Sequence, residues 1–161
     1  MSKTTTHIWR LGGTILAALL IFTTITVSQQ PAQADGQFVD DDGNVHETAI
    51  EAIAAEGITL GCGDGSYCPD GVVTREQIAS FLARALDLSF EGSAGFTDTT
   101  NSPHATDIDK IAAAGITIGC SSDRYCPTQA ITRAELATMM TRAFGLPSTS
   151  RNYFVDDDGL R

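Results

Sequence analysis

Basic side chains are scarce in this sequence of 161 residues. It contains 10 lysines and arginines against 20 aspartates and glutamates, so its formal net charge is −10 at pH 7. Nucleic-acid binding needs clustered cations that displace counterions from phosphates, and this charge balance argues against such a partner. The length excludes a large multidomain enzyme, and 42% hydrophobic residues exclude a disordered polyelectrolyte. We expect one ordinary domain or two small ones.

Recognisable catalytic motifs are also missing. The sequence has no G-x-S-x-G, no H-E-x-x-H, no Cys-x-x-Cys and no lone cysteine that could act as a nucleophile. His46 and His104 lie at equivalent places in an internal repeat, whereas an active site would break that symmetry. We interpret both as packing residues at helix starts. The prediction is a protein without catalytic residues, cofactor or metal.

Only the N-terminus carries a long uncharged, apolar-rich run, from Leu11 to Val27. Lys3 and Arg10 precede it, and the small-residue tripeptide Ala32-Gln33-Ala34 follows. This order predicts a Sec signal peptide over residues 1–34, cleaved after Ala34, and therefore a secreted protein. An uncleaved anchor is the alternative, although 17 residues are at the short limit for a membrane span. Cleavage would remove two cations and make the net charge −12, with no later segment able to enter a membrane.

The rest of the chain repeats itself with a period of 58 residues. Residues 38–88 align with 96–146 without a gap and are identical at 22 of 51 positions. A third copy starts at residues 154–159, whose six residues are identical to residues 38–43. The predicted division is a signal peptide at 1–34, repeat 1 at 35–95, repeat 2 at 96–153 and a truncated start of repeat 3 at 154–161.

Each repeat is predicted to be a helix–loop–helix unit, which makes the fold class mainly α. In repeat 1, a turn at Asp42–Asn44 leads into a helix over about 45–56, and Gly57 supplies the left-handed stop. A short extended piece follows at 58–60, and a second helix runs over about 74–86. Two short helices bury little apolar surface, so the copies are expected to share a core.

The second helix of each repeat begins with a capping box. The pairs are Thr74 with Gln77 and Thr132 with Glu135. In each pair the threonine side-chain oxygen accepts a hydrogen bond from the backbone N–H of its partner, and the partner's side chain accepts one from the threonine backbone N–H. Such a cap stabilises a helix by about 1 kcal/mol.

Four cysteines form two Cys-x5-Cys pairs, Cys62 with Cys68 and Cys120 with Cys126. An even cysteine count in an exported protein points to disulfides, and four cysteines allow three connectivities. The duplication favours the two local pairs, each of which would stabilise the fold by about 2–2.5 kcal/mol. Zinc is the competing interpretation, but its ligands usually stand closer together.

Acidic residues crowd the start of repeat 1, in the run Asp40-Asp41-Asp42-Gly43-Asn44. The run partly fits a calcium-binding loop, but Val45 stands where that loop requires glycine. We therefore favour a turn that caps a helix over a calcium site.

Arg75 and Arg133 stand at the first position of their helices, where the helix dipole disfavours a cation. Each lies at the edge of the apolar arc, so its guanidinium is expected to point into a groove. Arginine matches carboxylate or phosphate with two parallel hydrogen bonds, which makes both residues candidates for anion binding. The alternative is an internal ion pair with Asp40 or Asp98.

A second arginine follows nine residues later in each of these helices, Arg84 and Arg142. Nine residues correspond to about 180° around a helix. Both side chains are therefore expected to be solvated on the polar face.

Together these motifs resemble the S-layer homology (SLH) repeat. The shared elements are Phe-x-Asp, an alanine-rich helix ending in Gly-Ile-Thr-x-Gly, Tyr-x-Pro, and Thr-Arg-x-x before Phe-Leu-x-Arg-Ala. Residues 131–135 reproduce the I-T-R-A-E signature, and residues 73–77 are a variant of it. The resemblance covers 38–146 and the start of a third copy from 154.

The resemblance implies non-covalent attachment of exported proteins to the bacterial cell wall. In this family three repeats form a pseudo-threefold, mainly helical spindle, whose grooves bind anionic secondary cell-wall polysaccharide or peptidoglycan. It follows from the resemblance that the ligand-binding residues would be Thr74, Arg75, Thr132, Arg133 and Glu135. A structural or self-assembly element, and the N-terminal part of a larger exported enzyme, are the alternatives.

Three features depart from the family pattern. The third repeat stops after its first residues, so this chain alone would leave the spindle incomplete. Many members carry tryptophan early in the first helix, where this chain has Val45 and Pro103. The Cys-x5-Cys pair is not general in the family.

Overall fold

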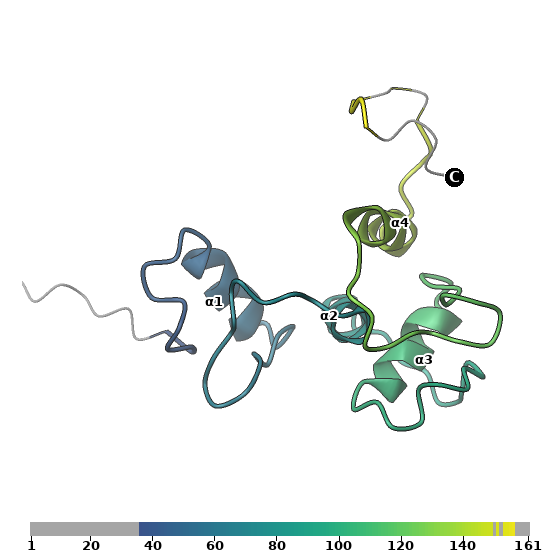
Figure 1. The fold of residues 1–161 in the computed structure, drawn as a ribbon, viewed down its shortest axis with the longest axis horizontal. Coiled ribbons are helices and arrows are strands. Elements are labelled where there is room, and N and C mark those ends of the chain that lie inside the picture. The colour runs from purple at the N-terminus through teal and green to yellow at the C-terminus, as the bar shows by residue number, and fades with distance from the viewer. Residues whose placement is uncertain (1–35, 150, 152, 157–161) are drawn as a thin grey trace, which may run out of the picture. The chain divides into compact units, whose positions relative to one another are not determined.

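Four helices make up the regular structure of the chain in a computed structural model that describes residues 36–149, 151 and 153–156. They are α1 (Glu47–Ala55), α2 (Arg75–Ala85), α3 (Ala105–Ala113) and α4 (Arg133–Ala143) (Figure 1). The described residues contain no β-strand, so the prediction of a mainly helical fold is confirmed. None of the described helices has the length and apolarity needed to cross a membrane. The predicted signal peptide and its cleavage site lie outside the described residues.

Capping boxes start the second helix of each repeat, as predicted. Thr74 Oγ1 accepts from the Gln77 backbone N–H at 3.4 Å, and Gln77 Oε1 accepts from the Thr74 N–H at 2.9 Å. Thr132 and Glu135 make the same two bonds at 3.2 and 2.9 Å. The caps fix where α2 and α4 begin because each box satisfies two backbone groups that a helix end leaves free.

The first helices are shorter than predicted. The turn extends through Asn44, whose side chain accepts from the His46 N–H at 2.9 Å, so α1 begins at Glu47 rather than near residue 45. At the other end Gly57 is left-handed, with φ +67°, and Ile58 N–H donates to Ile53 O at 2.9 Å. Glycine suits this stop because it has no Cβ to clash in the left-handed region.

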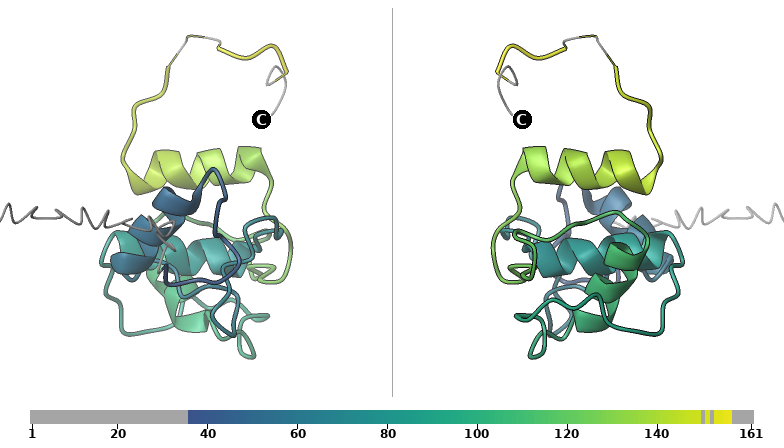
Figure 2. Two further views of the ribbon diagram at one scale, coloured as in Figure 1. Left: turned by 90° about the vertical axis from the view of Figure 1, so that its left-hand side faces the viewer. Right: turned by 90° about the vertical axis from the view of Figure 1, so that its right-hand side faces the viewer.

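The main core lies between the repeats. The helices α2 and α3 pack side by side, although they belong to different repeats (Figures 1 and 2). The buried residues at this contact are Ile78, Ala79, Leu82 and Ala83 from α2, Ile108 and Ile111 from α3, Met139 from α4, and Ile116 and Tyr125. The expectation of a shared core is therefore correct for these two helices.

A smaller cluster belongs to α1. Phe38, Ile50 and Ala54 are buried together, with Tyr67 packed against them. This cluster lacks the second helix that α2 supplies to α3, so it is the weaker part of the apolar interior.

One face of α4 differs sharply from its counterpart on α2. The α2 face is buried against α3, whereas the equivalent face of α4 is exposed within the described residues. The buried residues are Ala79, Ser80, Leu82 and Ala83, and their exposed equivalents are Ala137, Thr138, Met140 and Thr141.

Both predicted disulfides are present. Cys62 pairs with Cys68 and Cys120 with Cys126, with a Cα–Cα distance of 6.0 Å in each pair. All four cysteines are used, which overturns the zinc alternative. Each bond closes a loop within one repeat.

The two equivalent faces predict unequal effects on stability. Leu82 is 6% exposed and Met140 is 39% exposed. We expect Leu82→Ala to lower the free energy of unfolding by about 2–4 kcal/mol, because it leaves a cavity between α2 and α3. Met140→Ala should cost less than about 1 kcal/mol. Urea denaturation of the two variants measures both values, and equal losses would contradict the asymmetry.

Candidate functional site

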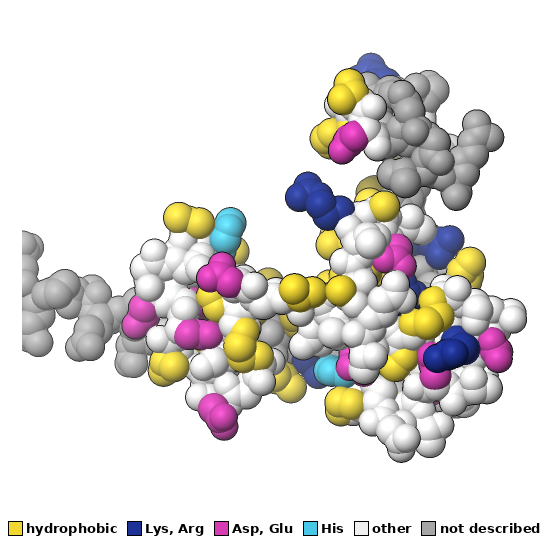
Figure 3. All heavy atoms as spheres, viewed as in Figure 1, with side chains coloured by type: hydrophobic (Ala, Val, Ile, Leu, Met, Phe, Trp, Pro, Cys, Tyr) yellow, Lys and Arg dark blue, Asp and Glu magenta, His cyan; other side chains and the backbone are white. Residues whose placement is uncertain are grey.

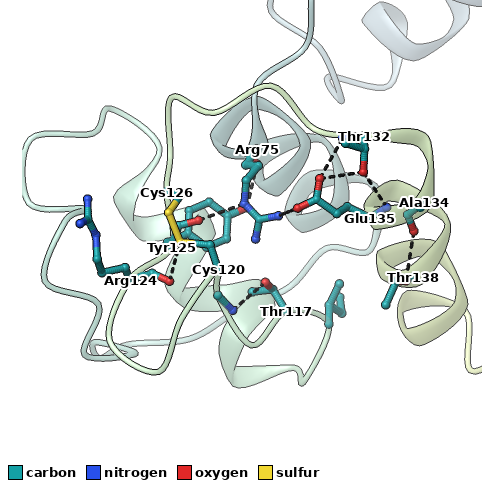
Figure 4. A network of polar contacts seen from close by, with 12 residues as sticks. Arg75, Thr117, Cys120, Arg124, Tyr125, Cys126, Thr132, Ala134, Glu135 and Thr138 are labelled. Carbon is teal, nitrogen blue, oxygen red and sulfur yellow. Dashed lines mark hydrogen bonds and ion pairs between the residues drawn. A yellow bond between two sulfur atoms is a disulfide. The ribbon is translucent and has the colours of Figure 1, made fainter. Parts of the chain in front are cut away.

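Arg75 lies buried where the two repeats meet. Only 3% of this residue is exposed, although it is charged. Its Nε donates to the Tyr125 carbonyl at 3.0 Å, its Nη1 lies 2.8 Å from Glu135 Oε1, and its guanidinium stands 5.1 Å from the Tyr125 ring centroid (Figure 4). The Tyr125 hydroxyl in turn donates to the Arg75 carbonyl at 2.7 Å. Arg75 therefore joins the repeats through an ion pair, a cation–π contact and two hydrogen bonds.

Backbone groups of repeat 2 complete the start of α2. The Arg75 N–H donates to Gln129 O at 2.8 Å, and the Glu76 N–H donates to Pro127 O at 3.0 Å. These N–H groups have no partner within their own helix, so the loop of the next repeat satisfies them. The carbonyl oxygens and Glu135 place negative charge beside Arg75, which explains how a cation is tolerated at this helix end.

The protonation states of Glu135 and Tyr125 suit the contacts that they make with Arg75. Hydrogen bonds from the backbone and side chain of Thr132, followed by the attraction of Arg75, lower the pKa of Glu135. Burial raises the pKa of the Tyr125 phenol well above its ordinary value, so its hydroxyl keeps its proton. Glu135 is therefore an anion and Tyr125 a donor at neutral pH.

Asp40 and Asp98 do not pair with Arg75, so the predicted partner of an internal ion pair is wrong. Each carboxylate instead accepts two backbone N–H groups from its own disulfide loop. Asp98 bonds to Tyr125 and Cys126 at 2.8 and 2.9 Å, and these bonds outweigh burial and lower its pKa. The N–H of Tyr67 lowers the pKa of Asp40 in the same way. Both aspartates hold loops in shape.

The predicted binding residues divide into two groups. Thr132 bonds to Glu135, Glu135 bonds to Arg75, and Thr74 caps the helix that Arg75 begins, so these four lie along one interface. Arg133 lies apart. It is exposed, and its side chain makes no hydrogen bond or ion pair with the described residues. Arg75 and Arg133 therefore have different environments, although they occupy equivalent positions in the two repeats.

A pocket opens beside Arg84, and it is called the larger pocket because it exceeds a second one in repeat 2. It has a volume of about 360 Å³, and its lining includes Tyr67, Gln77, Ser80, Arg84 and His104. No aspartate or glutamate lines it, in a protein whose net charge is −10. Basic side chains are otherwise scattered over the face drawn in Figure 3. The pocket therefore combines one arginine with an aromatic wall and no lining carboxylate.

The smaller pocket occupies the equivalent place in repeat 2. Its volume is about 190 Å³, and Thr117, Glu135, Thr138 and Arg142 line it together with Arg75 from repeat 1. Figure 4 shows Arg75 and Glu135 facing each other there. This pocket differs from the larger one in containing a carboxylate, Glu135, which is paired with Arg75.

Arg84 and Arg142 are not simply solvated, which corrects the expectation for them. Arg84 Nη1 donates to Ile58 O at 3.3 Å, and Arg142 Nη1 donates to Ile116 O at 3.4 Å. The segment after each first helix folds back beside the second helix and offers this carbonyl. The helical periodicity alone does not show that approach.

His104 lies in a polar network between α2 and α3. Ser80 Oγ is 2.8 Å from His104 Nδ1 and donates to Asp107 Oδ2 at 2.7 Å. Lys110 pairs with Asp107 at 2.9 Å. His46, the equivalent residue in repeat 1, is exposed, so its interpretation as a packing residue is wrong. Within the described part of the chain, α1 has no neighbour comparable to α2.

Asp41 is fully buried, and neither of its carboxylate oxygens has a hydrogen-bond partner within the described residues. Burial, followed by the negative charge of Glu51 and Glu47, raises its pKa. The equivalent residue Thr99 instead donates its hydroxyl proton to Phe96 O at 3.2 Å. Among the residues described, no group of three or more His, Cys, Asp or Glu side chains could hold a metal ion, so no such site accounts for Asp41.

Comparison with known proteins gives one family. The sequence profile of the S-layer homology domain matches residues 40–79 and 95–137, together about half of the chain. An S-layer protein of Bacillus licheniformis is 27% identical over 91% of this chain and 17% of its own length. An amylopullulanase of Thermoanaerobacterium thermosulfurigenes is 30% identical over 87% of this chain. Exoglucanase XynX of Acetivibrio thermocellus is 30% identical over 66% of it. The chain spans 8% and 10% of the lengths of these two enzymes.

The two helix-start arginines should differ in their effect on stability. Arg75→Ala leaves Glu135 and the Tyr125 carbonyl without their partner, and we expect a loss of about 2 kcal/mol, since Glu135 is partly exposed to water. Arg133→Ala should change the stability by less than about 0.5 kcal/mol. Chemical denaturation of both variants provides the comparison, and a small effect at Arg75 would show that its contacts are not stabilising.

We expect buried Asp41 to lower the free energy of unfolding by an amount that depends on pH. Because its pKa is raised on folding, the penalty is absent below the ordinary aspartate pKa, where both states are protonated. The penalty grows as pH rises through that value towards the raised pKa of the folded state. Asp41→Thr, which introduces the residue of repeat 2, should therefore be more stable than the parent at pH 7, and this advantage should shrink at pH 3.

Denaturation midpoints between pH 3 and 8 test this prediction. Asp42→Thr is the matched control, because Asp42 is exposed and its removal should leave the stability nearly unchanged. A gain from Asp42→Thr as large as that from Asp41→Thr would assign the effect to net charge rather than to burial.

Proposed function

The chain belongs to the S-layer homology family, and from this premise we propose that it anchors an exported protein to the bacterial cell wall without catalysing a reaction. The family and its S-layer relatives indicate a cell-surface protein. Relatives named as S-layer proteins and as two different enzymes share only this short segment with the chain. What they share is therefore better explained by attachment than by a common reaction.

The proposed ligand is an anionic secondary cell-wall polysaccharide or peptidoglycan, and the larger pocket supports this choice best. Arg84 is the one fully charged group in its described lining, and carboxylates are absent there. Tyr67 and Phe81 offer rings, and Gln77 offers a side-chain amide. Rings beside hydrogen-bonding groups suit a sugar, and a guanidinium suits its carboxylate.

The residues predicted from the family signature receive distinct roles in this proposal. Arg75 and Glu135 build the wall of the smaller pocket, and Thr74 and Thr132 hold the helix starts that position them. Arg133, which is exposed, is available to a wall polymer at the surface. The disulfides Cys62–Cys68 and Cys120–Cys126 keep the loops beside the pockets closed.

The proposed organisation of the chain follows its sequence. A signal peptide over 1–34 directs export, and cleavage after Ala34 releases the protein to the cell envelope. Repeats over 35–95 and 96–153 carry the binding surface, and the copy that starts at 154 continues the pattern. The larger proteins that share this segment support attachment of a bigger assembly.

A structural or self-assembly role is the second candidate, and the exposed face of α4 favours it. Met140, Phe144 and Leu146 are large apolar residues at 39%, 54% and 54% exposure, where the equivalent α2 residues are buried or half-buried. Concentration-dependent light scattering together with no binding to cell walls would favour this role over anchoring.

Arg84 provides the direct test of the anchoring proposal. We expect Arg84→Gln to weaken co-sedimentation with purified cell walls about tenfold, because a charge-assisted hydrogen bond to the ligand is lost. Arg151→Gln removes the same charge outside both pockets and should bind like the parent protein. Circular dichroism verifies that each variant is folded. Undiminished binding by folded Arg84→Gln would remove the larger pocket from the proposal.

A further inference from the structure

The hydrogen bonds of Ser80 assign the tautomer of His104. Ser80 is 1% exposed, and its oxygen contacts both His104 Nδ1 and Asp107 Oδ2, at 2.8 and 2.7 Å. A serine hydroxyl has one proton, which it donates to Asp107. His104 Nδ1 must therefore carry a proton and donate it to the Ser80 oxygen. The ring nitrogen that gains or loses a proton is Nε2.

Charged groups surround this network. Asp107 accepts from Ser80 and Lys110 and lies 3.9 Å from Arg84 Nη2. Burial acts to raise the pKa of Asp107, but the hydrogen bonds from Lys110 and Ser80 and the charges of Lys110 and Arg84 lower it overall, so it stays ionised. The ionised Asp107 takes the Ser80 proton, so Ser80 presents only its oxygen to the imidazole.

The remaining charged groups near the ring come from both helices. Glu76 on α2 accepts from Ser102 Oγ at 2.6 Å, and the His104 backbone N–H donates to the same Ser102 oxygen at 3.0 Å. Arg84 on α2 and Lys110 on α3 are the opposing cations. Two carboxylates and two cations thus belong to the hydrogen-bond network that holds His104, and His104 lines the larger pocket with Arg84.

We propose that His104 is a ligand-binding residue that makes anion binding in the larger pocket depend on protonation. In the protonated ring, Nδ1–H remains bonded to Ser80, and Nε2–H becomes a second cationic donor beside Arg84. A carboxylate-bearing wall saccharide then binds with the uptake of one proton. Binding is tighter in mildly acidic than in mildly alkaline conditions. This inference rests on the proposed function, because it concerns the same pocket.

The repeat supplies an internal control. His46 is the equivalent of His104, but it is exposed, makes no described contact through its ring and does not line either pocket. The smaller pocket has no histidine in its lining. A pH effect that depends on His104 and not on His46 would therefore belong to the larger pocket.

The experiment measures co-sedimentation of the full chain with purified cell walls at pH 8 and pH 5.5. The parent protein and His46→Gln should bind about tenfold more tightly at pH 5.5, as expected for one added charge-assisted hydrogen bond. His104→Gln should change less than twofold between the two pH values, since glutamine cannot gain a proton. The same tenfold rise in His104→Gln would overturn the inference and assign the effect to the walls or to other groups.

Two outcomes separate this inference from the proposed function. Failure of the parent protein to bind walls at either pH contradicts the anchoring function itself. Binding by the parent with no change between the two pH values contradicts only the role of His104.

A second measurement does not depend on the variant folding. The NMR titration midpoint of the His104 ring, followed in the parent protein with and without solubilised wall polysaccharide, should move to higher pH when the polysaccharide is bound. An unchanged midpoint under saturating polysaccharide would overturn the inference even if His104→Gln proved unstable.

Discussion

Everything in this fold depends on the contact between one repeat and the next. A unit of two short helices buries too little apolar surface to be stable alone, and here α2 of the first repeat packs on α3 of the second. Arg75 strengthens the same contact, because its guanidinium reaches across to Tyr125 and Glu135. The core, the buried arginine and the pockets are therefore products of one interface.

This dependence explains why equivalent residues behave differently. Leu82 and Met140, Ser80 and Thr138, and Arg75 and Arg133 have the same sequence surroundings but different burial. In each pair the repeat 1 residue is buried at the contact with repeat 2, and its counterpart is exposed within the described residues. The physical environment of a residue is thus set by its place in the array as well as by its place in the repeat.

Much of the local structure was predictable from the sequence, because local signals determine it. The capping boxes at Thr74 and Thr132, the stop at Gly57 and the two disulfides each depend on residues close together in the chain. The partner of Arg75, the bonds of Arg84 and the exposure of His46 were predicted wrongly, since they depend on residues brought together by packing. The sequence did not indicate the unpaired state of Asp41 either, because only its burial in the fold distinguishes it from the neighbouring aspartates.

The cap on α2 makes the start of this helix depend on residues that come much later in the chain. The backbone N–H groups of Arg75 and Glu76 are satisfied by carbonyls of Gln129 and Pro127, which follow the Cys120–Cys126 loop. In a chain synthesised from its N-terminus, the residues of α2 are made before these carbonyls are. The first turn of α2 therefore gains these hydrogen-bond partners only once the loop of repeat 2 has been made, so repeat 1 completes its folding only in the presence of repeat 2.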